Sequence, residues 1–322
     1  MEKEDKIKKV IFYNAGNYSC NLRCHYCYLE EYKPSEKKLS NKEQIKLFSK
    51  KNLEGIAFFN FVTNGETLLY EKNIELIELL LKEGHVINIV TNLTYSEGVN
   101  KIISLPKELS ERVIIHASLH YNELKEKNKL QIYFDNIKKL KAANISHHMD
   151  LTIAPEYMPI LDEIKNSCIN NVGILPNITI ALDKSNNWMP YKFYDEQTHQ
   201  IIKKIFEAKE LDVLKKFYTA TQGKICKAGL WSFSYDNDHG FVIPCNGIHK
   251  SLKRHWLTKK IKFKEVGICP HKHCFCGEIF LTWGLIPELI DIPNYFEFYL
   301  KDKGFYNETI KKLTNVKLTN NN

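Results

Sequence analysis

The chain has 322 residues, of which 43% are hydrophobic, and a formal net charge of +8 at pH 7. This length supports a sizeable core and one or two domains. No apolar run approaches the ~18 residues of a transmembrane helix, and the charged first residues are unlike a secretory signal, so we expect a cytoplasmic protein with no membrane partner. The lysines are scattered among glutamates, as on solvated helix faces, which argues against a nucleic-acid partner.

The cysteines lie in tight local groups, and their total of nine is odd. Both facts favour metal ligation in a reducing compartment over a framework of disulfides. The cysteine groups are therefore candidate metal sites.

The N-terminal part of the chain alternates short β-rich runs with amphipathic helices. The predicted strands cover residues 10–13, 56–62, 86–90, 113–119, 148–153 and 174–182. Among the helices between them, one begins at a capping box of Ser40 and Glu43 and continues to about residue 50. Six βα units imply a parallel sheet with helices outside, and six are too few for a closed eight-stranded barrel. The predicted fold class is therefore α/β, an open partial (β/α)6 barrel.

A loop with three cysteines follows the first predicted strand. Cys20, Cys24 and Cys27 are spaced C-x3-C-x2-C, and Tyr26 stands just before the third cysteine. Three thiolates on one loop can hold three corners of a cubane iron–sulfur cluster, which normally has four cysteine ligands. The fourth iron is then open, as a catalytic metal requires. A zinc knuckle is the alternative, but a zinc site usually pairs two C-x2-C-like hooks, and no second hook lies nearby.

This stretch resembles the signature of the radical S-adenosylmethionine (SAM) enzymes. In that family, SAM chelates the open iron through its amino and carboxylate groups, and the reduced cluster cleaves SAM to a 5′-deoxyadenosyl radical. The resemblance implies a SAM-binding [4Fe–4S] cluster, SAM as a cofactor, and a reductant such as flavodoxin or ferredoxin. The family's core domain is also an open partial barrel.

A second motif follows the second predicted strand. Asn64-Gly65-Glu66-Thr67 resembles the family's Gly-Gly-Glu-Pro motif, which meets the SAM ammonium group. Asn64 replaces the first glycine and Thr67 the proline, but the carboxylate of Glu66 is retained. Gly65 allows a close approach of the backbone, and Glu66 can pair with the ammonium. The alternative is an ordinary strand-to-helix turn.

Polar residues also end the next two predicted strands, where ligand-binding residues collect in α/β folds. Asn92 can present an amide to the SAM carboxylate or ribose. Ser118 lies in a Ser-Leu-His stretch that resembles a strand end of the family, where the serine meets the ribose or carboxylate. Helix capping is the simpler role for both. His116 and His120 are possible substrate contacts, with a structural role as the more ordinary explanation.

The βα alternation stops in the C-terminal third. A long helix, about 195–218, leads to a predicted hairpin of residues 231–235 and 241–243 with a cysteine at each end. A cysteine-rich hook follows. The candidate ligands of this region are Cys226, Cys245, Cys269, Cys274 and Cys276. Hairpin cysteines followed by such a hook are a strong metal-site pattern.

This region resembles the auxiliary-cluster extensions of the SPASM and twitch subfamilies, which contain a Gly-x4-Cys element such as Gly240 to Cys245. Five cysteines suffice for one auxiliary [4Fe–4S] cluster, closer to the twitch type. A zinc site that includes His271 or His273 is the alternative. We expect a radical SAM core over residues 1–190, a connecting helical segment over 191–222, and a C-terminal cysteine-rich auxiliary-cluster domain with a closing helix over 223–322.

Two features lie outside the motifs, namely Cys168 and the segment after Phe280. Cys168 shares a helix face with Leu161 and Ile164, so it is predicted to be a buried core thiol, with a hydrogen-atom donor as the alternative. The segment after Phe280 is expected to form a helix packed on the barrel, and the last residues, 318–322, a frayed tail.

The resemblance implies an oxidoreductase-like enzyme that abstracts a hydrogen atom from an unreactive C–H bond and gives an oxidised or cross-linked product. The substrate is either a small molecule, as in the twitch-type aminocyclitol dehydrogenase, or a peptide or protein, as in peptide maturases and sulfatase-maturing enzymes. Because the first strand begins near residue 9, we expect a small substrate or a separate recognition protein. A non-catalytic iron–sulfur electron carrier is a further alternative, although it would have no use for a SAM-binding loop at 64–67.

Overall fold

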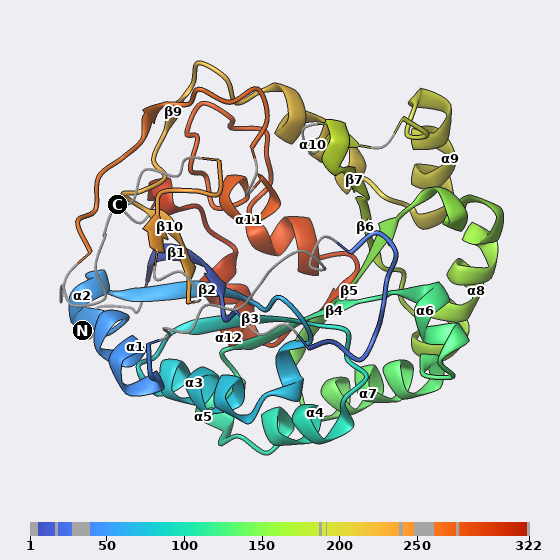
Figure 1. Cartoon of the computed structure of the whole chain (residues 1–322), viewed down its shortest axis with the longest axis horizontal. Coiled ribbons are helices and arrows are strands. Elements are labelled where there is room, and N and C mark those ends of the chain that lie inside the picture. Colours follow the sequence, from blue (N-terminus) through green and yellow to red (C-terminus); the bar gives the residue numbers. More distant parts are fainter. Residues whose placement is uncertain are drawn as a thin grey trace.

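The structure is a computed structural model that describes residues 6–16, 19–27, 39–186, 189–190, 192–237, 241–247, 261–274 and 277–320. Its central feature is a nine-stranded sheet with the strand order β11-β10-β1-β2-β3-β4-β5, in which β6 and β13 both pair with β5. Figure 1 shows this sheet as a curved layer through the middle of the molecule.

The first six strands confirm the predicted parallel sheet. They are β1 (Ile7–Asn14), β2 (Ile56–Val62), β3 (Val86–Thr91), β4 (Val113–Ser118), β5 (Ser146–Ile153) and β6 (Asn177–Ile180). Each strand pairs in parallel with the next. The other edge of β1 is taken by β10, so these six strands form an open partial barrel. The strand β6 is shorter than predicted because its register with β5 covers only residues 177–180.

Helices between the strands form an outer layer along the convex side of the sheet (Figure 1). They are α1 (Asn41–Leu47), α2 (Lys50–Leu53), α3 (Glu71–Lys82), α4 (Ser96–Ile103), α5 (Lys107–Ser110), α6 (Tyr121–Glu126), α7 (Leu130–Ala142) and α8 (Leu161–Val172), with 3-10 turns η2 (Thr67–Leu69) and η3 (Pro155–Ile160). The capping box of Ser40 and Glu43 is present at α1, as predicted. Cys168 on α8 is fully buried, as predicted.

The two faces of the sheet differ in polarity. Phe59 on the outer face packs on Phe48 and His85. The inner face carries a row of polar side chains, because strand register places Asn60 beside Asn88 and His116 beside His148. This polar row is a feature of the barrel interior, where the C-terminal segments cover it.

The expectation of a single long helix at 195–218 is wrong. The chain forms α9 (Glu196–Phe206) and α10 (Glu210–Thr219), separated at Glu207, which has a left-handed backbone with φ of 53°. The break turns Glu210 into the interior, where its carboxylate accepts hydrogen bonds from the Ile178 backbone N–H at 2.9 Å and from Lys303 at 2.8 Å. Tertiary contacts therefore override a pattern that is locally compatible with one helix.

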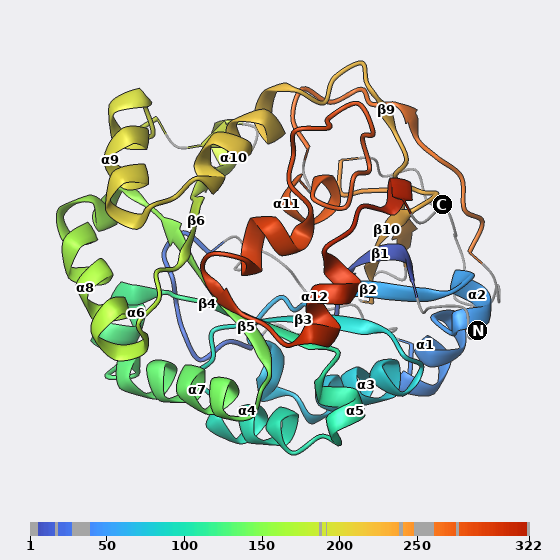
Figure 2. The ribbon, with the colours of Figure 1, turned by 180° about the vertical axis from the view of Figure 1, so that it is seen from behind.

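The predicted hairpin is confirmed, and it extends the main sheet. Its strands are β10 (Ser232–Asp236) and β11 (Phe241–Ile243), which are antiparallel, and β10 pairs in parallel with β1. At the other edge, β13 (Gly304–Phe305) pairs antiparallel with β5. Figure 2 shows α10 beside β6 at this side of the sheet. Two further pairs of short strands are β9 (Ile225–Cys226) with β12 (Gly267–Ile268), and β7 (Leu182–Asp183) with β8 (Met189–Pro190). A 3-10 turn, η4 (Lys184–Asn186), lies between β7 and β8.

The expected closing helix is instead a series of short pieces. They are α11 (Gly277–Leu281), a π-helical turn (Phe296–Leu300), α12 (Glu308–Thr314) and the 3-10 turn η6 (Leu318–Asn320). Trp283 and Tyr295 are buried against Phe58 of β2, which closes the barrel interior. The expectation of a frayed tail is wrong for Leu318. This residue is fully buried, and its N–H donates to the Trp283 carbonyl at 3.0 Å. Residues 321–322 lie outside the described residues.

Among the described residues, no helix is long and apolar enough to span a membrane.

Candidate functional site

The three cysteines of the first motif lie close together after β1. A backbone hydrogen bond from Cys27 N–H to the Cys24 carbonyl, 2.9 Å long, turns the loop back on itself. Burial raises the pKa of the Cys24 thiol to about 12, and the nearby groups Glu123, Cys27 and Cys20 act in the same direction. Three neighbouring thiols on one loop fit an iron–sulfur cluster with three protein ligands, and iron binding would release their protons.

Asn92, just after β3, lies against this cysteine loop. Its amide nitrogen donates to Asn21 Oδ1 at 2.8 Å and lies 3.6 Å from Cys20 Sγ, while its Oδ1 accepts from the Thr94 backbone and hydroxyl. The predicted Asn92 is thus brought to the cysteine loop. Its contacts show that it orients the loop directly.

Glu66, the carboxylate of the second motif, is almost completely buried and joins three segments. Oε1 accepts from the Leu68 N–H at 3.1 Å and from the Thr91 hydroxyl, and Oε2 accepts from the Asn92 N–H at 2.7 Å. The Glu66 N–H in turn donates to the Ser19 carbonyl at 3.0 Å. Burial raises the pKa of Glu66, and these donors oppose the shift. A carboxylate has about four acceptor positions, so one remains for a ligand's ammonium group.

The other residues of this motif hold the loop in place. Asn64 accepts from the Asn14 side chain at 3.3 Å, which connects the ends of β1 and β2. The Thr67 hydroxyl donates to the Val90 carbonyl at 2.5 Å. Thr67 is the first residue of η2, a position at which proline is also tolerated. Gly65 is half-buried and lies between Asn64 and Glu66, which are both buried.

Tyr26 connects the cysteine loop to the end of β4. Its hydroxyl lies 2.8 Å from His120 Nδ1 and 3.4 Å from the Tyr157 hydroxyl. Burial lowers the pKa of His120 to about 4, so the imidazole is neutral at pH 7. Ser118 ends β4 on the same side of the sheet and is half-buried. The predicted residues therefore meet at one end of the parallel strands.

A polar cluster inside the barrel was missed by sequence reasoning, except for His116. His116, His148 and Asp150 each have a ligand-type atom within 4.8 Å of the others, and His116 Nε2 lies 3.7 Å from Asp150 Oδ2. Burial lowers the pKa of His116 to about 4 and raises that of Asp150 well above its usual range. Glu278 of α11 lies nearby, with a pKa raised to about 7 by burial. The period-2 spacing of His148 and Asp150 is visible in the sequence, but the register that adds His116 is not.

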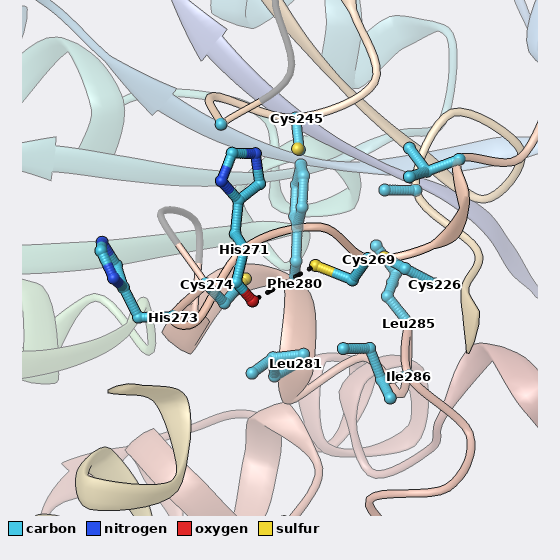
Figure 3. A pocket seen from close by; sticks show the side chains of 13 residues that line it. Cys226, Cys245, Cys269, His271, His273, Cys274, Phe280, Leu281, Leu285 and Ile286 are labelled. Atoms are coloured by element: carbon cyan, nitrogen blue, oxygen red, sulfur yellow. Dashed lines mark hydrogen bonds between the residues drawn. The ribbon is translucent and has the colours of Figure 1, made fainter. Parts of the chain in front are cut away.

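The second cysteine region forms a separate cavity. It is lined by Cys226, Cys245, Cys269 and Cys274, with His271 and His273. Figure 3 shows the sulfur atoms of Cys245, Cys269 and Cys274 around this space, with the His271 ring beside them. Cys226 pairs with Gly267 across β9 and β12, which brings it close to Cys269. Cys276 lies outside the described residues.

The surroundings of these four thiols suit a cluster that is fully ligated by protein. Burial raises the pKa of the Cys226 thiol to about 12, and the proximity of Cys245 and Cys269 adds to this shift. Phe280, Leu281, Leu285 and Ile286 form an apolar wall. Backbone hydrogen bonds, from the Cys274 N–H to Phe217 and from the Gly223 N–H to Cys269, attach the hook to the chain around α10. Four thiols match the usual ligand number of a [4Fe–4S] cluster.

Comparisons with known proteins match one family model and several solved structures. Residues 17–159 match the family model of the radical SAM superfamily. SuiB from Streptococcus suis, solved with its precursor peptide SuiA, is similar in fold, with a TM-score of 0.54 and 14% identity over 79% of this chain and 64% of SuiB. anSMEcpe with bound AdoMet has a TM-score of 0.57 and 14% identity over 78% of each chain.

The chain spans less than two thirds of SuiB, with 62% covered in the SAM-bound structure. No curated protein sequence matches the chain significantly.

Proposed function

Residues 17–159 match the family model of the radical SAM superfamily, and we propose that the protein reductively cleaves SAM and abstracts a hydrogen atom from its substrate. The observation that carries the proposal is the contact between the two motifs. The cysteine loop and the Glu66 loop are joined by the hydrogen bond from Glu66 N–H to Ser19 and by the contacts of Asn92 with Asn21 and Cys20. A pure electron carrier has no need for such a buried carboxylate beside its cluster.

Cys20, Cys24 and Cys27 would hold a [4Fe–4S] cluster with one open iron. When bound, the cluster supplies the electron that cleaves SAM and releases the 5′-deoxyadenosyl radical. The chain's own residues bind and orient SAM. Glu66 accepts the ammonium group, because it is the one carboxylate of the loop and is held rigidly by three donors.

The remaining residues of the predicted SAM site have supporting roles in this proposal. Gly65 lets SAM approach the backbone, while Asn64 and Thr67 fix the loop around it. Asn92 and Ser118 line the ends of β3 and β4, where they would meet the SAM carboxylate or ribose. Tyr26 positions the third cysteine against His120.

We further propose that Cys226, Cys245, Cys269 and Cys274 ligate an auxiliary [4Fe–4S] cluster. With four protein ligands, it would have no open iron and would serve to accept an electron from the substrate radical. The apolar wall around the thiols limits solvent access, which tunes the potential of such a cluster. The net reaction would then be an oxidation or a cross-link. The zinc alternative rests on His271 and His273, which line the same cavity.

A peptide or protein side chain is the substrate class that the comparisons support. SuiB is solved with the precursor peptide SuiA, and anSMEcpe with the peptides Cp18Cys and Kp18Cys. A small molecule is the substrate class that the sequence favoured, and it stays the second candidate. A flavodoxin or ferredoxin would supply the electron.

The proposal is tested by the joint replacement of Cys20, Cys24 and Cys27 with alanine. The reconstituted wild-type chain should form 5′-deoxyadenosine from SAM when dithionite is present, and the triple variant should form none. Cys168→Ala is the matched control, because this thiol is buried on α8 and belongs to neither cysteine group. Undiminished SAM cleavage in the triple variant would refute the assignment.

A further inference from the structure

The polar cluster inside the barrel consists of His116 on β4 with His148 and Asp150 on β5. The parallel register places His116 directly beside His148, and Asp150 follows two residues later on the same face. One ligand-type atom from each residue lies within 4.8 Å of the others. Neighbouring strands thus bring two imidazoles and one carboxylate to a single point.

Each residue of this cluster has a buried polar atom without a hydrogen-bond partner among the described residues. These atoms are His116 Nδ1, His148 Nε2 and Asp150 Oδ2. His148 is completely buried and Asp150 is 5% exposed. An unsatisfied buried polar atom costs roughly 1–3 kcal/mol, and one on each of three neighbouring residues is unusual in a native protein. An ion pair of His116 and Asp150 would leave His148 Nε2 unexplained.

The other polar atoms of His148 and Asp150 are already held from outside the cluster. Asp150 Oδ1 accepts from the Thr179 hydroxyl at 3.1 Å. His148 Nδ1 lies 3.4 Å from the side-chain amide nitrogen of Asn177, which donates to the Tyr299 carbonyl at 3.0 Å. Both partners lie on β6, so they fix the ring and the carboxylate from behind. The hydrogen bond from Thr179 to Asp150 is an outer contact of the kind that orients the carboxylate ligands of metal sites.

The electrostatic surroundings favour a cation at this point. Asp150 lies close enough to Glu278 and Glu210 to feel their charges, and the nearby Lys303 is already paired with Glu210 at 2.8 Å. The Tyr299 ring covers the cluster, with its centroid 4.8 Å from that of His148 and 6.0 Å from that of His116. A carboxylate enclosed in this way is stabilised by a positive partner.

We propose that His116, His148 and Asp150 bind a divalent first-row transition metal, such as zinc or ferrous iron, inside the barrel. Two imidazoles and one carboxylate suit these ions, and three protein ligands leave coordination positions open. The site contains no thiol and is distinct from both cysteine groups. It does not depend on the proposed SAM chemistry.

Zinc is the probe for the test. The anaerobically reconstituted wild-type chain is dialysed against Zn²⁺, and the bound metal is counted and examined by X-ray absorption at the zinc edge. We expect about one zinc per chain beyond the iron, with nitrogen and oxygen ligands at about 2.0–2.1 Å and no sulfur at about 2.3 Å. The absence of bound zinc, or a shell that contains sulfur, would overturn the proposal.

Variants can locate the site through zinc affinity alone, without an activity assay. Asp150→Asn and His148→Gln keep the size of the side chain and should each weaken zinc binding at least tenfold. His147→Gln is the matched control, because His147 is the same residue type on the same strand, but its ring packs on Phe305 and its Nδ1 contacts the Ile145 carbonyl. It should bind zinc as tightly as the wild type. An equal loss in the His147 and His148 variants would contradict the assignment.

Discussion

Glu66 is the residue on which the proposed SAM site depends most. It is buried, and its three donors come from η2 and from the end of β3, so its position is fixed before any ligand binds. A charged group held in this way loses little freedom on binding, which strengthens a charge-assisted hydrogen bond to an ammonium group.

Glu66→Gln should therefore weaken SAM binding. It keeps the shape and removes the charge, and the loss of a charge-assisted hydrogen bond costs about 1.5–3 kcal/mol, or roughly 10- to 100-fold in affinity. Affinity is measured by calorimetry on the reconstituted protein without reductant. Glu71→Gln is the control, because Glu71 is exposed at the start of α3 and pairs with Lys101. Equal SAM affinity in the wild type and the Glu66 variant would show that another group meets the ammonium.

Thr91→Val separates charge from position in the same experiment. Thr91 donates its hydroxyl to Glu66, so valine removes a neutral donor and leaves the carboxylate charged. If Glu66 acts through its charge, this variant should bind SAM more tightly than Glu66→Gln. Iron content, measured on the same preparations, shows whether the cysteine loop is intact.

The sequence alone could identify site residues that lie close together within one motif. Cys20, Cys24 and Cys27 lie within eight positions, and Glu66 follows its strand directly, so local spacing was sufficient. His148 and Asp150 were not identified, because their partner His116 comes from another strand and the register between β4 and β5 cannot be read from composition. The contact of Asn92 with the cysteine loop could not be predicted from the sequence for the same reason, because it joins segments that follow different strands.

At the scale of elements, the break between α9 and α10 is the clearest departure from the sequence-based expectation. Residues 206–210 contain no glycine or proline, and their pattern allows a continuous helix. The left-handed Glu207 ends α9, and the next turn buries Ala208 and Glu210. Burial of these two side chains against the barrel outweighs the local cost, which for a non-glycine residue in this conformation is roughly 1–2 kcal/mol.

Two exposed positions test this break. Glu207→Gly should leave the free energy of unfolding unchanged or raise it by up to about 1 kcal/mol, because glycine adopts the left-handed backbone without strain. Lys204→Gly, in the last turn of α9, should lower it by about 1 kcal/mol, because glycine weakens a helix. Anaerobic urea unfolding measures both. Equal destabilisation by the two variants would mean that the helix is continuous through residue 207.

At the scale of the whole molecule, the sheet places three polar sites at different levels of one barrel. The first cysteine loop follows β1, at the carboxyl end of the parallel strands. Cys226 comes before β10 and Cys245 after β11, and β10 runs parallel to β1, so this pair lies towards the amino end of the strands. The cluster of His116, His148 and Asp150 lies on the inner face between these ends.

This order along the strands suits the proposed reaction. A substrate inside the barrel would meet the radical source at one end and an electron acceptor towards the other. The sequence predicted both cysteine groups and the hairpin, but it could not select the ligands of the second group. The structure brings Cys226, Cys245, Cys269 and Cys274 to one cavity, while Cys276 lies outside the described residues. The pairing of β9 with β12, which involves only two residues on each strand, brings Cys226 close to Cys269.

The central claim is that one chain holds two separate four-iron clusters, and the metal content of the Cys20, Cys24 and Cys27 triple-alanine variant tests it most directly. Iron and zinc are measured per chain after anaerobic reconstitution, beside the wild type and Cys168→Ala. We expect about eight irons in the wild type and the control, and about four in the triple variant, counting four irons per cluster. A triple variant that retains zinc and no iron would contradict the auxiliary cluster and, with it, the oxidative outcome.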